Sequence, residues 1–232
     1  MYYWEYESTY NSAPCVAIAT GLGRPSENVK TGPIVQIWYL DATIPPHDAV
    51  RCGQDESVCG SCPFRGHGFK GRACYVRVEQ GPLSAWKRWN AGRNHPGVDI
   101  RPQHTGRIIR DGAYGDPASM PRAAHDAMIG ALKPARIIGY THGARQAPHL
   151  KGQVMASATG RDARSWYRRG WSVFAAVSNA RDAARAWRAD GIPSVVCAAE
   201  ARGTTCERCG RCTGRWHGIV AITAHGNGRS YL

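Results

Sequence analysis

The chain has 232 residues, of which 43% are hydrophobic, and its 30 Lys and Arg residues exceed its 17 Asp and Glu residues to give a net charge of +13. No apolar run approaches the ~20 residues that cross a bilayer, and the hydrophobic content is too high for a disordered chain. The first residues, MYYWEYE, are aromatic and acidic and do not have the pattern of a secretory signal. We therefore expect a cytoplasmic protein with no membrane partner, folded as a single domain over residues 1–232.

Apolar runs typical of strands recur along the chain, with helical patterns between several of them. The strand-like runs cover residues 33–40, 106–112, 135–141, 153–158, 171–177, 193–199 and 218–224. Residues 121–133 and 181–190 have an apolar face at helical spacing, and Ser178 and Asn179 are candidate caps for the second helix. This alternation predicts an α/β fold with a parallel sheet, built as a complete or partial β/α (TIM-like) barrel. A doubly wound open α/β sheet is the alternative.

Four of the nine cysteines lie in a long predicted loop, at about 41–105, that follows the first of these runs. Cys59, Cys62 and Cys74 form a C-x2-C-x11-C pattern. Three thiolates would hold three irons of a 4Fe-4S cluster and leave the fourth open for water, a substrate or a cofactor. Cys52 is the only upstream candidate for a fourth ligand, whereas Cys15 stands alone and is typical of a buried core cysteine.

A second set of cysteines lies in another predicted loop, at about 197–217, which also follows a strand-like run. We therefore expect both cysteine groups at the same ends of the strands. Cys206, Cys209 and Cys212 form a C-x2-C-x2-C run, and Cys197 lies nine residues before it as a candidate fourth ligand. Thiolates at two-residue gaps can each bind a different iron of a cubane, whereas structural zinc is usually bound by two separated pairs. The spacing favours one or two iron-sulfur clusters, with zinc as the alternative. The non-functional interpretation is that these thiols are buried small side chains or disulfide partners.

Polar residues follow several predicted strands, where the sites of β/α folds gather. Gly115 permits close backbone approach beside Asp116, and His142 and His225 each follow another apolar run. These positions make Asp116, His142 and His225 candidate catalytic residues, because carboxylates and imidazoles serve as acids, bases or ligands. A simple Gly-Asp-Pro turn and hydrogen-bonded structural histidines are the alternatives.

The densest basic segment is RDARSWYRR, from Arg161 to Arg169. Arginines mixed with Trp166 and Tyr167 can hold phosphates and stack bases, so this surface is a candidate for nucleic-acid binding. A solvated helix face is the other interpretation, and arginines also balance the charge of bound clusters.

Several motifs together resemble a family of proteins encoded by actinobacterial phages. They are KTGPIVQ, CGSCP, CYV, GAYGDP, YTHG and the final C-x2-C-x2-C with AHG, and the likeness extends from Lys30 to Gly226. This resemblance implies a phage product that works in the host cytoplasm, and it does not imply a reaction.

A more distant resemblance is to radical S-adenosylmethionine enzymes, whose barrels carry a three-cysteine 4Fe-4S cluster after the first strand. By this resemblance, the cluster at Cys59, Cys62 and Cys74 would bind S-adenosylmethionine. Gly115 and Asp116 would approach the methionine amino group, and the last cysteines would hold an auxiliary cluster. The chain departs from the usual C-x3-C-x2-C spacing and has aspartate where the Gly-Gly-Glu-Pro motif of the family has glutamate.

Three functions follow from these patterns. The first is an iron-sulfur protein that acts as a radical-S-adenosylmethionine-like enzyme on an unknown substrate. The second is a non-catalytic iron-sulfur sensor or carrier that works with an electron donor. The third is a zinc-stabilised protein that binds nucleic acid through its basic surface.

Overall fold

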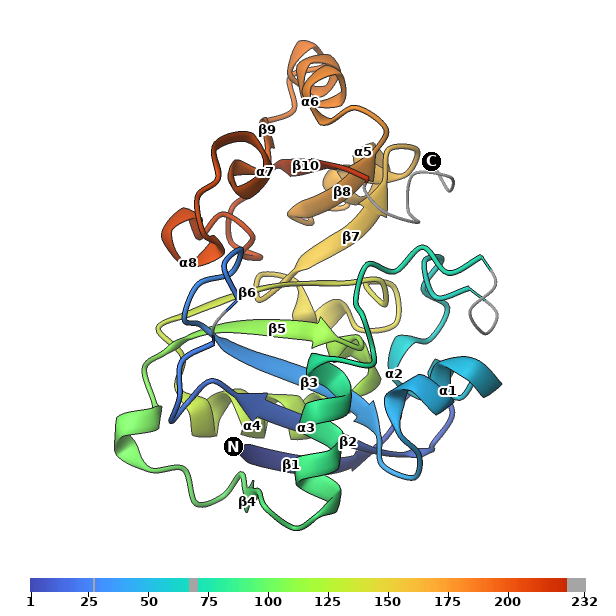
Figure 1. The fold of residues 1–232 in the computed structure, drawn as a ribbon. Helices are drawn as coiled ribbons and strands as arrows, with labels where there is room; N and C mark the ends of the chain where they lie inside the picture. Colours follow the sequence, from blue (N-terminus) through green and yellow to red (C-terminus); the bar gives the residue numbers. More distant parts are fainter. Residues whose placement is uncertain (27, 67–70, 225–232) are drawn as a thin grey trace.

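The computed structural model describes residues 1–26, 28–66 and 71–224 and contains one ten-stranded sheet (Figure 1). The strand order is β4-β1-β2-β3-β5-β6-β7-β8-β10-β9. The strands are β1 (Tyr2–Glu7), β2 (Pro14–Thr20), β3 (Val35–Asp41), β4 (His95–Pro96), β5 (Ile108–Tyr114), β6 (Arg136–Thr141), β7 (Met155–Thr159), β8 (Val173–Val177), β9 (Ser194–Val196) and β10 (Ile219–Thr223). The strands β3, β5, β6, β7 and β8 are parallel and lie side by side in this order.

The α/β class and the mainly parallel sheet are confirmed, but a complete barrel is not formed. The sheet is open, with β4 at one edge and β9 at the other. A closed barrel needs its first and last strands to pair, whereas here the antiparallel β1 and β2 extend the sheet beyond β3. At the opposite end β10 lies between β8 and β9, so the chain crosses over there before the sheet ends.

Seven strands coincide with the seven apolar runs predicted from the sequence, while β1, β2 and β4 were not predicted. The hairpin of β1 and β2 pairs Tyr2 with Ala19 and Tyr6 with Cys15. Both tyrosines and the middle of β2 are buried, so the aromatic residues at the beginning of the chain are core residues of a strand. β4 has two residues and depends on its pairing with β1.

The segment at about 41–105 was predicted to be a loop, but it contains regular helices. The helices of the chain are α1 (Pro46–Cys52), α2 (Glu56–Cys59), α3 (Gly81–Asn90), α4 (Arg122–Leu132), α5 (Ala163–Arg168), α6 (Ala180–Ala189), α7 (Ala198–Arg202) and α8 (Cys206–Cys209), with 3-10 turns η1 (Pro102–His104), η2 (Pro117–Ser119) and η3 (Pro148–Leu150). The two predicted helices correspond to α4 and α6, and Asn179 caps α6 by accepting from the N–H groups of Arg181 and Asp182.

Helices cover both faces of the sheet, with α3 in front of the strands and α4 behind them (Figure 1). Neighbouring residues of β3 show the two faces, because side chains alternate along a strand. Trp38 packs against Gly81 at the beginning of α3. Tyr39 donates its hydroxyl hydrogen bond to Asp111, which in turn contacts His125 of α4.

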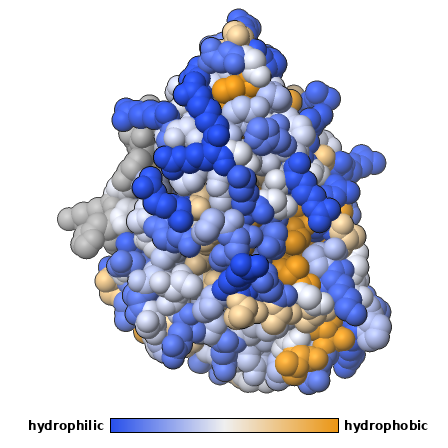
Figure 2. All heavy atoms as spheres, turned by 180° about the vertical axis from the view of Figure 1, so that it is seen from behind, coloured by the Kyte–Doolittle hydropathy of each residue, from blue (hydrophilic) through white to orange (hydrophobic). Residues whose placement is uncertain are grey.

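Two hydrophobic clusters form the core. One joins β1, β2, β3 and β5 to α3 and α4, and the other joins β7, β8 and β10 to α5 and α6. The face seen from behind is mainly hydrophilic, with small apolar areas between the charged side chains (Figure 2). In the described ranges no helix is long and apolar enough to cross a membrane.

Candidate functional site

The first cysteine group, Cys59, Cys62 and Cys74, is drawn together by backbone hydrogen bonds. Cys59 ends α2, and the N–H of Cys62 donates to its carbonyl at 3.1 Å in a tight turn. The N–H of Cys74 donates to the carbonyl of Phe64 at 2.8 Å, which returns the chain to a point two residues beyond Cys62. Gly60 has a φ of +52° between the first two cysteines, so this turn favours glycine.

The three thiols are close enough to affect one another electrostatically. Burial raises the pKa of Cys62 to about 12, with Cys74 and Asp116 adding to the effect and the N–H of Phe64 opposing it. Burial also raises the pKa of Cys59, and Asp55, Cys62 and Cys74 add to that increase. Protonated thiols are therefore favoured in the free protein, and a bound cation would have to displace their protons.

Buried polar atoms without a protein partner surround this group. In the described part of the chain they include the hydroxyls of Tyr10 and Tyr114 and Nη2 of Arg72, whereas Nη1 of Arg72 forms an ion pair with Oδ2 of Asp55 at 3.5 Å. Cys59 influences the pKa of Tyr10, Tyr114 and Arg72, so all three lie within electrostatic reach of its thiol. Buried donors rarely lack an acceptor in a native protein, so these groups indicate an acceptor outside the polypeptide, either a water molecule or a ligand.

Sequence reasoning did not identify these donors. Tyr10 follows β1, Arg72 lies in the segment before Cys74, and Tyr114 ends β5, so they are far apart along the chain. No short motif joins them. The only local signal was the GAYGDP motif, which contains Tyr114.

Asp116 is fully enclosed by hydrogen-bond donors. Its Oδ1 accepts from the N–H of Ala118 at 2.9 Å and from Oγ1 of Thr141 at 2.6 Å. Its Oδ2 accepts from the N–H groups of His142 at 2.6 Å and Gly143 at 3.2 Å. Burial raises the pKa of Asp116, whereas His142 and these donors oppose the increase. The carboxylate thus fixes the chain that leaves β6.

Gly115 lies directly before this carboxylate with a φ of +73°. A Cβ there would stand 2.6 Å from the backbone oxygen of Tyr39, so only glycine fits. The N–H of Asp116 donates to the carbonyl of Val58 in α2 at 2.7 Å. The strand end and the first cysteine group are therefore joined by the backbone, although the proposed roles of Gly115 and Asp116 in cofactor binding remain predictions.

His142 lies at the same edge of the sheet, directly after β6. Its ring contacts the ring of Phe64 edge to face at 5.4 Å, and Phe64 lies two residues beyond Cys62. Burial lowers the pKa of His142 while Asp116 opposes the decrease. The structure thus brings His142 close to the first cysteine group, and its catalytic role stays a prediction. His225 lies outside the described residues.

The second cysteine group, Cys197, Cys206, Cys209 and Cys212, also comes together. Burial raises the pKa of Cys212, and the other three thiols add to the increase. Cys206 and Cys209 are the two ends of α8, whose first turn is capped by Thr205. Cys197 lies directly before α7, nine residues before Cys206, and its N–H donates to the carbonyl of Ala221 in β10.

The two groups do not lie at the same ends of the strands, contrary to the expectation from the sequence. The N–H of Cys206 donates to Lys30, which precedes β3, and the carbonyl of Cys212 accepts from Gly139 of β6. In Figure 1, α8 lies where β3 and β5 begin, whereas α2 lies where they end. The second group therefore lies toward the beginnings of β3 and β5.

The Arg110 guanidinium and two tyrosines connect the surroundings of the two groups. Arg110 donates to the hydroxyl of Tyr75, which follows Cys74, and to that of Tyr140 at 3.2 Å. Arg110 also lowers the pKa of Cys206, against burial, which raises it. Polar side chains on β5 and β6 thus connect the residue after Cys74 with the surroundings of Cys206.

The remaining thiols lie apart from these groups. Cys15 is buried in β2 and belongs to the core cluster, as expected for an isolated cysteine. Cys52 ends α1 at the surface and donates to Oε1 of Gln54 at 3.1 Å. Among the residues described, no three His, Cys, Asp or Glu side chains are arranged to hold a single metal ion.

The basic segment from Arg161 to Arg169 uses much of its polar and aromatic surface within the protein. Arg164 forms an ion pair with Asp190 at 2.6 Å. Trp166 packs on the second core cluster, and Arg169 lies over its ring at 5.1 Å. Tyr167 stacks on His217. These contacts favour the interpretation of this segment as a partly solvated helix face over its interpretation as a nucleic-acid-binding surface.

Comparison of the chain with protein-family models, curated proteins and solved structures found no match.

Proposed function

We propose that this is an iron-sulfur protein in which the first cysteine group holds a 4Fe-4S cluster with one open iron. The supporting observation is the set of buried hydroxyl and guanidinium donors without protein partners around three neighbouring thiols. The sulfides of a cluster accept such hydrogen bonds. Arg65 and Arg72 share the single carboxylate of Asp55 in ion pairs, which leaves one positive charge to balance a cluster bound by three thiolates.

The spacing of the cysteines along the sequence also favours a cluster over a single zinc ion. A cubane binds each thiolate at a separate iron, whereas structural zinc is usually bound by two separated pairs. The second cysteine group, with four thiols, has the composition of a fully ligated 4Fe-4S site. We therefore assign chemistry to the first group and a structural or electron-transfer role to the second.

The reaction class that best fits an open iron in this setting is reductive cleavage of S-adenosylmethionine. A cluster held by Cys59, Cys62 and Cys74 would supply the one electron that breaks a carbon-sulfur bond of the sulfonium, and an external electron donor would have to replace that electron. In this proposal Asp116 holds the backbone that carries His142, and His142 is positioned to contact a ligand of the open iron. His225 is the further candidate for the same role.

The proposal is tested by anaerobic purification followed by assays of iron, acid-labile sulfide and zinc. We expect a coloured protein that contains both iron and sulfide. Cys62→Ser should lose about half of the iron, and Cys206→Ser should lose the other half. Cys15→Ala is the matched control, because its thiol lies in the core, contacts the carbonyl of Ser57 and belongs to neither group. A colourless protein with stoichiometric zinc and no labile sulfide would overturn the proposal.

Addition of S-adenosylmethionine to the reduced protein tests the reaction class. An enzyme of this class should form 5′-deoxyadenosine, and Cys62→Ser should not. If clusters are present but no 5′-deoxyadenosine forms and the cluster spectrum does not change, the second candidate is favoured: a redox carrier or sensor. The contacts of Arg110 between the two groups support that candidate.

A further inference from the structure

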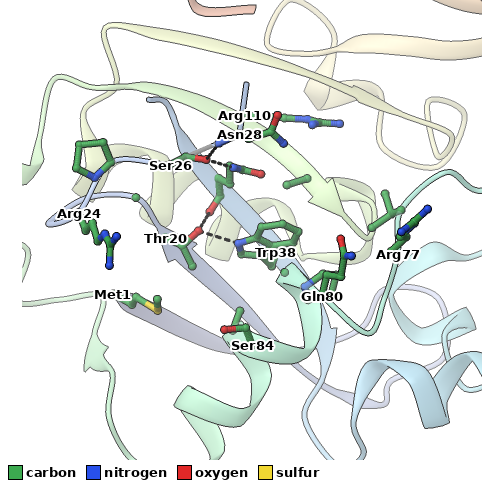
Figure 3. Close-up of a pocket in the computed structure, with 18 of the residues that line it drawn as sticks. Met1, Thr20, Arg24, Ser26, Asn28, Trp38, Arg77, Gln80, Ser84 and Arg110 are labelled. Carbon is green, nitrogen blue, oxygen red and sulfur yellow. Dashed lines mark hydrogen bonds between the residues drawn. The ribbon is translucent and has the colours of Figure 1, made fainter. Parts of the chain in front are cut away.

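An open cavity of about 730 Å³ lies over β2, β3 and β5 on the side of the sheet that α3 covers. Its walls come from the loop after β2, the segment after Cys74 and the beginning of α3 (Figure 3). The volume is in the range of sites that enclose small molecules. The cavity is separate from the first cysteine group, because none of its thiols lines it.

The lining is strongly cationic. Arg24, Arg77 and Arg110 contribute to it, and among the described lining residues none is Asp or Glu. Arg24 and Arg77 are exposed at the rim, whereas Arg110 is half-buried and donates to two neutral phenols. In the described ranges Arg110 forms no ion pair with a carboxylate. A guanidinium in such a position is best satisfied by a phosphate or carboxylate ligand.

The beginning of α3 adds a second source of positive potential. Gln80, Gly81 and Ser84 line the cavity, so the N-terminal turn of this ten-residue helix opens onto it. Pro82 has no N–H group, and the N–H groups of Leu83 and Ser84 donate to the carbonyls of Val78 and Gln80, so the helix favours an anion through its dipole and the N–H of Gly81. The arginines and the helix therefore select the same kind of charge.

The floor of the cavity is aromatic and is held in place by hydrogen bonds. Nε1 of Trp38 donates to Oγ1 of Thr20 at 2.8 Å, and Nε2 of Gln36 donates to Oγ of Ser26 at 2.7 Å. Figure 3 shows Trp38 between Arg24 and Arg77, with Asn28 nearby. An indole ring beside arginines suits a ligand that has both a planar ring and an anionic group.

We propose that this cavity binds a nucleoside phosphate, with the base over Trp38 and the phosphate between Arg77 and Arg110. The ligand is either a free nucleotide or one nucleotide of a single strand. This binding site goes beyond the iron-sulfur proposal and does not depend on it, because its contacts involve none of the cysteine side chains. The two proposals therefore fail separately.

Calorimetric titration of the intact protein at low, fixed salt tests the site. The probes are AMP, adenosine and a 5′-phosphorylated single-stranded oligonucleotide. We expect AMP to bind at least about tenfold more tightly than adenosine, because charge-assisted hydrogen bonds to phosphate are strong. Arg77→Glu should weaken AMP binding at least about tenfold, since it also reverses a charge. Arg77 is exposed, so this variant should fold normally.

Arg185→Glu, at an exposed position of α6, is the control for a general change of charge and should bind AMP like the natural protein. Equal affinities of the two variants, equal binding of AMP and adenosine, or no binding of AMP would each overturn the proposal. If the oligonucleotide binds no more tightly than AMP, the ligand is a free nucleotide. If it binds at least about tenfold more tightly and Arg77→Glu abolishes that preference, the ligand belongs to a strand.

Discussion

Replacement of Asp116 with asparagine tests whether this buried carboxylate fixes the edge of the sheet that carries the candidate site. The carboxylate accepts four hydrogen bonds, two at each oxygen. An asparagine has one acceptor oxygen, so its NH₂ group must face two donors in either orientation. Only the hydroxyl of Thr141 can rotate away; the N–H groups of Ala118, His142 and Gly143 cannot.

The magnitude follows from these contacts. A buried donor without an acceptor costs about 1–3 kcal/mol, and Asp116→Asn leaves one or two such donors, so we expect a loss of about 3 kcal/mol in the free energy of unfolding. With a urea slope of about 2 kcal/mol per molar, the midpoint of urea unfolding should fall by about 1.5 M. A shift of this size in the urea midpoint can be measured in a single series of unfolding curves.

The control for Asp116→Asn is Asp190→Asn, which removes one surface ion pair with Arg164 and should cost less than about 1 kcal/mol. Circular dichroism of both variants in urea gives the comparison. If Asp116→Asn lowers the midpoint no more than Asp190→Asn does, the four hydrogen bonds do not stabilise the fold as argued here.

Two further predictions concern the sheet and its covering helix. Burial lowers the pKa of His125, but the carboxylate of Asp111 at 2.9 Å has the larger effect, so the pKa is raised. The ion pair should therefore stabilise the fold fully below about pH 6.5, and this stabilisation should be lost as the pH rises through the raised pKa. Urea midpoints between pH 6 and pH 9 should therefore fall more steeply for the natural protein than for His125→Gln, and parallel profiles would contradict the assignment. Gly139→Ala should lower the melting temperature, because the added Cβ would overlap the backbone oxygen of Asp111. Gly130→Ala is the control, because open space surrounds this position in α4, and it should raise the free energy of unfolding by about 0.5–1 kcal/mol. Equal melting temperatures of the two variants would contradict the prediction and show that the sheet can adjust.

The sequence predicted the repeating parts of this fold well, because their signal is local. The seven apolar runs and the faces of α4 and α6 are periodic patterns that can be read within about ten residues. It missed β1 and β2 because their aromatic and small residues do not alternate clearly. Tyr2 and Tyr6 become core residues only through their pairing with Ala19 and Cys15.

The cysteine groups show the same division. Spacing alone grouped Cys59 with Cys62 and Cys206 with Cys209, since C-x2-C is a local feature. Spacing could not show that Cys74 returns to Phe64, or that the second group contacts Lys30 before β3 and Gly139 in β6. Those positions depend on loops that cross the sheet, and the course of a loop is set by the contacts that it makes far along the chain.

The sequence by itself determined that the chain is basic, that it alternates strands with helices, and that seven of its thiols occur in two groups. Only the tertiary structure decided that the sheet stays open, that unpartnered donors surround the first cysteine group, and that three arginines line one cavity. The physical reason is that composition and periodicity are properties of neighbouring residues. An unsatisfied hydroxyl or a cationic cavity exists only where strands and loops from distant parts of the chain pack together.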